Sequence, residues 1–173
     1  MYGFSVQVNC GFDEAISKVT EALKTEGFGV LTEIDVKATL KKKIDVDRKP
    51  YTILGACNPA LANQAINADP DIGLLLPCNV LVREEDDGAI TVAFMDPAAV
   101  LGLVDQSGVE QLAGEVRAKL EKVRDQLAGS GGLAVGQQRC PGFFDRGVGL
   151  AGDRFHNVYR QAGEFPAAGL KCR

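Results

Sequence analysis

The feature that most constrains the fold is a hairpin signal, Asp87-Gly88, between two apolar runs. An Asp-Gly pair suits the tight turn between neighbouring antiparallel strands, because glycine accepts the positive φ angle that such a turn requires. The preceding run covers residues 72–76, a break at Pro77-Cys78-Asn79, and residues 80–82; the returning run covers 89–94. The sheet is therefore predicted to contain antiparallel strands and not to be all parallel.

The rest of the first 128 residues alternates between the periods of strands and helices. Apolar residues recur at every second position in residues 2–8 and 28–34, and an almost continuous apolar run covers 51–57. These patterns predict strands, the last of them buried on both faces. Helical spacing predicts helices over residues 12–26, 36–44, 59–66 and 109–127, the last with one apolar stripe. Gly27 is predicted as the C-cap of the first helix, and Asp35 and Ser107 as the N-caps of the second and the fourth. Mixed periods of this kind indicate an α+β domain with an antiparallel or mixed sheet.

Residues 129–173 differ in composition from the rest of the chain. Ten of these 45 residues are glycine, and six basic against three acidic residues give the segment a charge of +3. Because the whole chain has a net charge of −4, residues 1–128 carry −7. We expect a compact domain at 1–128 and a Gly-rich, flexible C-terminal extension at 129–173. The alternative is a basic, aromatic arm that docks on the acidic domain or on a partner through Phe143, Phe144, Phe155 and Tyr159.

The charge and the apolar pattern argue against several classes of protein. A net charge of −4 without a visible basic face argues against nucleic-acid binding. The N-terminus lacks the basic start and continuous apolar stretch of a secretory signal. The longest apolar run, residues 72–76, is far shorter than the ~20 residues of a membrane span. We expect a soluble, cytoplasmic protein without nucleic-acid or membrane partners.

Cysteine is the most reactive side chain available in the domain, because no histidine occurs before residue 129. The five cysteines (Cys10, Cys57, Cys78, Cys140 and Cys172) lack the spacing of a disulfide framework or a zinc motif. We expect reduced thiols, no metal site and no cofactor. Cys10 lies in a predicted turn, and Cys140, His156 and Cys172 are treated as incidental to the site.

The first candidate site is Cys57-Asn58-Pro59, where a strand runs into a helix. Asn58 is a good N-cap and Pro59 a good first helical residue. The first turn of the helix favours the thiolate of Cys57 and can hold an anion, whereas burial would raise the pKa of the thiol. Two alternatives remain open: an active thiol with partial exposure, or a cysteine that only fills space at the end of a buried strand.

The second candidate site is Pro77-Cys78-Asn79. Proline cannot donate to a sheet ladder, so a bend or bulge in the strand is predicted there, and bulges often lie beside functional sites. We predict that Cys57 and Cys78 share one pocket, although the strand order that would place them together is not readable from the sequence. The candidate ligand-binding residues are Cys57, Asn58, Pro59, Pro77, Cys78 and Asn79, and the candidate catalytic residues are Cys57 and Cys78.

Three segments resemble family 302 of the domains of unknown function. They are GFGVLTEIDV at 27–36, LGACNP at 54–59 and IGLLLPCNV at 72–80, and the resemblance covers roughly residues 1–128. It implies a TATA-binding-protein-like α+β fold, with an antiparallel or mixed sheet packed on one side by helices, and a homodimer. The extension at 129–173 departs from the family pattern. The family supplies no established activity, so no catalytic residue is carried over and whether the chain is an enzyme stays open.

Two functional hypotheses follow. The first is a ligand-binding or assembly module for a small-molecule or anionic ligand, with its site between the Cys57 helix start and the Cys78 bend. The second is a thiol-based redox or sulfur-handling protein in which Cys57 is the nucleophile and Cys78 the resolving partner. A reactive thiol of low pKa at Cys57 favours the second hypothesis, and inert thiols favour the first.

Overall fold

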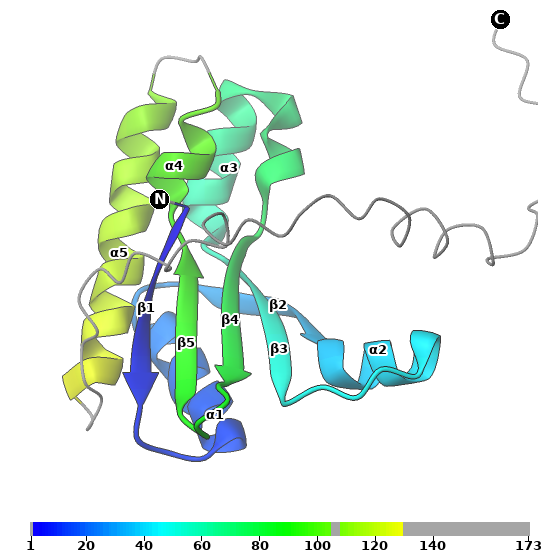
Figure 1. The fold of residues 1–173 in the computed structure, drawn as a ribbon. Coiled ribbons are helices and arrows are strands. Elements are labelled where there is room, and N and C mark those ends of the chain that lie inside the picture. Colours follow the sequence, from blue (N-terminus) through cyan, green and yellow to red (C-terminus); the bar gives the residue numbers. More distant parts are fainter. Residues whose placement is uncertain (1, 105–107, 130–173) are drawn as a thin grey trace, which may run out of the picture. The chain divides into compact units, whose positions relative to one another are not determined.

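A computed structural model describes residues 2–104 and 108–129 (Figure 1). Along the chain, the elements are β1 (Gly3–Val8), α1 (Phe12–Thr25), β2 (Gly29–Asp35), α2 (Val36–Ile44), β3 (Tyr51–Cys57), α3 (Pro59–Ala68), the 3-10 helix η1 (Pro70–Leu75), β4 (Cys78–Glu84), β5 (Ile90–Met95), α4 (Pro97–Leu101) and α5 (Val109–Gly129). The strands form one sheet in the order β1-β5-β4-β3-β2. Every neighbouring pair is antiparallel, which confirms the predicted α+β class.

The hairpin at Asp87-Gly88 joins β4 to β5, as predicted. Val82 lies opposite Val92, and Glu84 lies opposite Ile90 at the turn end of the pair. Gly88 has a φ of 86°, a left-handed conformation that favours glycine. The sequence signal therefore identified a real antiparallel pair at the centre of the sheet.

The core lies between one face of the sheet and the helices that cover it. Alternate residues of the central strands, including Leu54, Val80 and Val92, are fully buried on this face. Helix α1 packs on β2, β4 and β5, while α5 packs on β1 and on α1. In Figure 1, α1 lies behind the sheet and α5 runs beside β1. The apolar stripe predicted for 109–127 is confirmed as core, since Leu120 and Val123 are fully buried.

The helix ends are stabilised by the residues that the sequence indicated. Gly27 has a φ of 82°, and the chain leaves α1 with Gly27 N–H donating to Lys24 O at 3.0 Å and Phe28 N–H donating to Leu23 O at 3.0 Å. This is the left-handed C-terminal cap that glycine permits. At the start of α2, the Asp35 carboxylate accepts a hydrogen bond from Ala38 N–H at 2.8 Å.

The segment before Pro77 was predicted wrongly. Residues 72–75 lie in η1 and Leu76 is its C-cap, instead of the first half of an interrupted strand, and β4 begins only at Cys78. Pro70 suits the first position of a helix, and the Asp69 carboxylate accepts from Asp71 N–H at 2.9 Å. Pro77-Cys78-Asn79 is therefore the entry to a strand and not a bend within one.

Two predictions lie outside the described residues: the N-cap at Ser107 and the character of residues 130–173. Within the described residues, no helix is both long and apolar enough to cross a bilayer.

Candidate functional site

The candidate site is at the end of β3, where two separate segments of sequence meet. The register places Ala56 directly opposite Cys78, and Gly29 of β2 opposite Cys57. Cys57 is thus one residue beyond the last pair between β3 and β4. The strand order β4-β3-β2 is what brings the two cysteines to the same end of the sheet.

Asn58 connects this strand end to α3. Its side-chain oxygen accepts from Leu61 N–H at 3.3 Å, and its side-chain nitrogen donates to Glu26 O at 3.5 Å. The predicted N-cap is therefore confirmed. Because both ends of the amide are occupied, Asn58 also ties the start of α3 to the end of α1.

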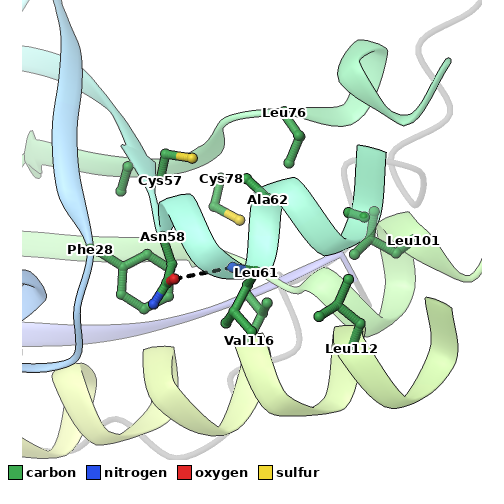
Figure 2. Close-up of a pocket in the computed structure, with 12 residues that line it drawn as sticks. Phe28, Cys57, Asn58, Leu61, Ala62, Leu76, Cys78, Leu101, Leu112 and Val116 are labelled. Carbon is green, nitrogen blue, oxygen red and sulfur yellow. Dashed lines mark hydrogen bonds between the residues drawn. The ribbon is translucent and has the colours of Figure 1, made fainter. Parts of the chain in front are cut away.

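A small apolar cavity of about 30 Å³ lies between this strand end and the helices (Figure 2). Its lining combines β3, β4, α3, α4 and α5 with residues of the neighbouring loops. The lining residues are Phe28, Ala56, Cys57, Asn58, Leu61, Ala62, Ala65, Leu76, Cys78, Leu101, Leu112 and Val116. Four of them are partly exposed and form the mouth: Cys57, Asn58, Ala62 and Leu76. The interior is almost entirely hydrocarbon, with the thiol of Cys78 as its polar group.

Both thiols at the cavity are held in the protonated form near neutral pH. Burial raises the pKa of Cys57, and burial together with the nearby Cys57 raises the pKa of Cys78 to about 11. Cys57 is partly exposed, as expected, and burial is the cause that raises its pKa. The direction is opposite to that of an activated thiol.

Three of the six predicted site residues line the cavity, and three do not. Cys57, Asn58 and Cys78 line it. Pro59 is an exposed first residue of α3. Asn79 is exposed and lies opposite Gly55, on the sheet face away from the helices, where Pro77 also approaches Gly55. Side chains that follow one another along a strand point to opposite faces, which separates Cys78 from both of its neighbours.

Most of the cavity wall was not recognised as part of a site. Leu112 and Val116 were predicted as core from the helical stripe, and Leu61 and Ala65 lie in a predicted helix. No sequence signal distinguishes a cavity wall from ordinary core, because both use the same apolar residue types. The gap arises only where several elements fail to fill the space between them.

The described residues contain no cluster of three or more His, Cys, Asp or Glu side chains able to hold a metal ion. Cys10, Cys57 and Cys78 are free thiols. Cys10 is partly buried after β1 and is absent from the cavity lining; burial is the main cause that raises its pKa. Cys140, His156 and Cys172 lie outside the residues that the structure describes.

The fold and this cavity define the class: a small α+β domain with one helix-covered sheet face and an apolar cavity beside a strand end. The chain belongs to the family described as "Domain of unknown function DUF302", whose model matches residues 4–127. This confirms the resemblance seen in the sequence.

The chain is also similar to two individual proteins. The chain is similar to a crystal structure of an uncharacterized conserved protein DUF302 from Bacillus stearothermophilus, with a TM-score of 0.69 and 30% identity. That likeness covers 73% of this chain and 98% of the other. It is also 28% identical over 74 residues to an uncharacterized protein of Aquifex aeolicus (strain VF5), covering 36% of this chain. The chain spans about half the length of that curated relative, 51%.

Proposed function

We propose that this domain binds a small apolar ligand, or the apolar end of a larger one, in the cavity beside Cys57 and Cys78. The observation that carries the proposal is the lining itself: hydrocarbon side chains from several elements surround an unfilled volume with a partly exposed mouth. Apolar cavities of this kind stay dry, so an apolar guest displaces no bound water. Packing enthalpy and burial of its surface then favour binding.

The size and polarity of the cavity limit what it accepts. A volume of about 30 Å³ is roughly that of two water-sized probes, which suits a short alkyl group better than a ring system. An anion is less well suited, because the walls supply no cationic side chain and Asn58 already accepts the Leu61 N–H. The proposed binding therefore depends on the shape and apolar lining of the cavity and requires no chemically activated side chain.

Binding is tested with xenon and short-chain alcohols as probes. The readout is the chemical shift of the methyl NMR signals of Leu61, Leu112 and Val116, which line the cavity. We expect saturable shifts at these methyls in the native chain. Ala62→Leu places added methyl groups at the mouth and should abolish them. Ala60→Leu is the matched control, because Ala60 is exposed on the same helix and does not line the cavity. No saturable shift in the native chain, or an unchanged response in Ala62→Leu, would refute the proposal.

The alternative, a thiol-based redox or sulfur-handling role for Cys57 and Cys78, receives less support. Because burial raises the pKa of both thiols, the thiolate needed for nucleophilic attack is scarce near neutral pH. We expect both to be alkylated at pH ~7 more slowly than free cysteine, with Cys57 faster than the buried Cys78. Mass mapping of alkylated peptides, with Cys57→Ser as control, measures this. A Cys57 faster than free cysteine would restore the redox hypothesis.

A further inference from the structure

Exposed apolar side chains lie close in the chain to residues that line the cavity. Ile66 on α3, Leu74 on η1 and Leu103 after α4 are 44%, 87% and 79% exposed. Each is within four residues of a lining residue; these lining residues are Ala62, Leu76 and Leu101, respectively. In Figure 1, α3 and α4 lie at the end of the sheet away from the β4–β5 turn. Large apolar side chains in water beside an open cavity are typical of a surface that another molecule covers.

The same part of the chain carries negative charge and no positive charge. The cavity end, defined as residues 58–82 and 97–116, contains neither lysine nor arginine. Its described carboxylates are Asp69, Asp71, Glu110 and Glu115, and the last three are exposed. None of the four pairs with a cationic side chain among the described residues. Uncompensated carboxylates around an apolar surface favour a cationic partner.

The cavity and the exposed side chains differ in scale. A volume of about 30 Å³ holds the end of one slender side chain, whereas Leu74 and Leu103 lie outside the lining. The thiol of Cys78, in the lining, belongs to a residue that is only 7% exposed, and it has no hydrogen-bond partner among the described residues. The thioether of methionine is a weak acceptor for such a thiol, and its unbranched chain fits a narrow space. A molecule that uses both the interior and the outer surface must be larger than the cavity.

The following inference rests on the proposed function of the cavity. We propose that the occupant is a side chain of a partner polypeptide: a basic segment that inserts one methionine between flanking lysines or arginines. The methionine fills the space beside Cys78, the flanking cations face Asp71 and Glu110, and the rest of the segment covers Leu74 and Leu103. In such an interface one buried apolar side chain supplies most of the binding energy, and the charges at the rim select the partner.

Three pentapeptides, acetylated and amidated at their ends, test the anchor and the charges separately. Ala-Lys-Met-Lys-Ala carries both, Ala-Lys-Ala-Lys-Ala lacks the anchor, and Ala-Glu-Met-Glu-Ala reverses the charges. The methyl NMR signals of Leu61, Leu112 and Val116 in the full-length chain give the dissociation constant of each peptide. We expect saturable shifts with the first peptide and affinities at least ~5-fold weaker for the other two at low salt. Salt at ~0.5 M should reduce the difference between the lysine and glutamate peptides.

Two double variants test the surface outside the cavity. Asp71→Lys/Glu110→Lys should reverse the preference between the lysine and glutamate peptides, because it replaces two carboxylates of the cavity end with cations. Its response to pentanol should stay that of the native chain, since neither residue lines the cavity. Leu74→Ser/Leu103→Ser should weaken binding of Ala-Lys-Met-Lys-Ala by ~3-fold or more, because it removes apolar surface that the peptide covers.

The matched control is Glu33→Lys/Asp86→Lys, which makes the same change of charge at exposed residues outside the cavity end. It should keep the native preference for the lysine peptide, and a reversal there as well would overturn the proposal. If pentanol shifts the cavity methyls and Ala-Lys-Met-Lys-Ala does not, this inference is wrong and the proposed function stands; if neither does, both are wrong. Equal affinity for pentylamine and the lysine peptide would assign the site to a small cationic amphiphile and overturn the polypeptide partner.

Discussion

The two edge strands, β1 and β2, are paired alike and differ in their surroundings. Each has one antiparallel neighbour among the described strands, β5 for β1 and β3 for β2. On β1, Val6 and Val8 are buried against the helices, and Phe4 stacks on Phe94 with 5.5 Å between the ring centroids. On β2, residues 31–35 are all exposed. Helix α1 also contacts β2, yet residues 31–35 stay exposed, so neither pairing with one strand nor contact with a helix is enough to bury an edge strand along its whole length.

The largest expected difference between the two regions is the effect of truncating a leucine. Leu54 of β3 is fully buried, so Leu54→Ala should lower the free energy of unfolding by about 3 kcal/mol, through lost burial and the cavity left behind. Leu31→Ala, on the exposed part of β2, should cost less than about 0.5 kcal/mol. Urea unfolding at dilute protein concentration measures both. Equal losses would show that residues 31–35 of β2 belong to the core.

The next difference concerns carboxylates. Asp96 is buried, caps α4 by accepting from Ala98 N–H at 3.0 Å, and lies 3.0 Å from Arg117 Nη1. Asp96→Ala should cost about 2 kcal/mol, because it removes a cap and a charge-assisted contact together. Asp47→Ala, in the loop after α2, removes only an exposed pair with Lys41 and should cost under about 0.5 kcal/mol. Thermal unfolding at fixed salt compares them, and similar losses would contradict the distinction.

Gly55 tests how closely the edge strand β2 packs against β3, where it lies opposite Thr32. A Cβ at this position would collide with Thr32 Oγ1 of β2 and come within 2.8 Å of Pro77 Cγ. Gly55→Ala should therefore cost about 1.5 kcal/mol by displacing β2 or Pro77. Adding Thr32→Ala should recover part of that loss, since it removes one of the two obstacles. A double-mutant cycle measures the coupling, and strict additivity would mean that β2 does not constrain Gly55.

The smallest expected effect is the dependence of stability on pH that Cys78 contributes. Its pKa is about 11 in the folded chain and 9.0 in the ordinary thiol, so the unfolded chain releases this proton first as pH rises. The contribution of Cys78 to the free energy of unfolding is complete at pH values below the pKa of the unfolded chain. It is lost as pH rises toward the pKa of the folded chain. Between about pH 8 and about pH 10, this group should lower the free energy of unfolding by about 1 kcal/mol.

Cys78→Ala serves as the control for that titration. The variant should lose less stability than the native chain over the same pH interval, because the shifted thiol is gone. Denaturant unfolding at both pH values gives the comparison. An identical loss in the two proteins would show that Cys78 is not the group responsible.

Local chemistry made a large part of the fold predictable. Turns and helix caps depend on neighbouring residues, so the sequence alone predicts them. Examples are the hairpin at Asp87-Gly88, the C-cap at Gly27 and the N-caps at Asp35 and Asn58. The error at 72–76 has the same local origin. A short apolar run fits a strand or a helix equally well, and Pro70 with the Asp69 cap favoured the helix.

By itself, the sequence determined the antiparallel hairpin, the helix ends, the apolar stripe of α5 and kinship with the family. Only the tertiary structure decided that β3 lies between β4 and β2, which brings Cys57 to Cys78 and turns Pro77 and Asn79 to the other face. It also decided which apolar residues surround a cavity and which lie exposed on β2 and α2. Periodicity records which side of an element is apolar, whereas the partner of that side depends on contacts between residues far apart in the chain.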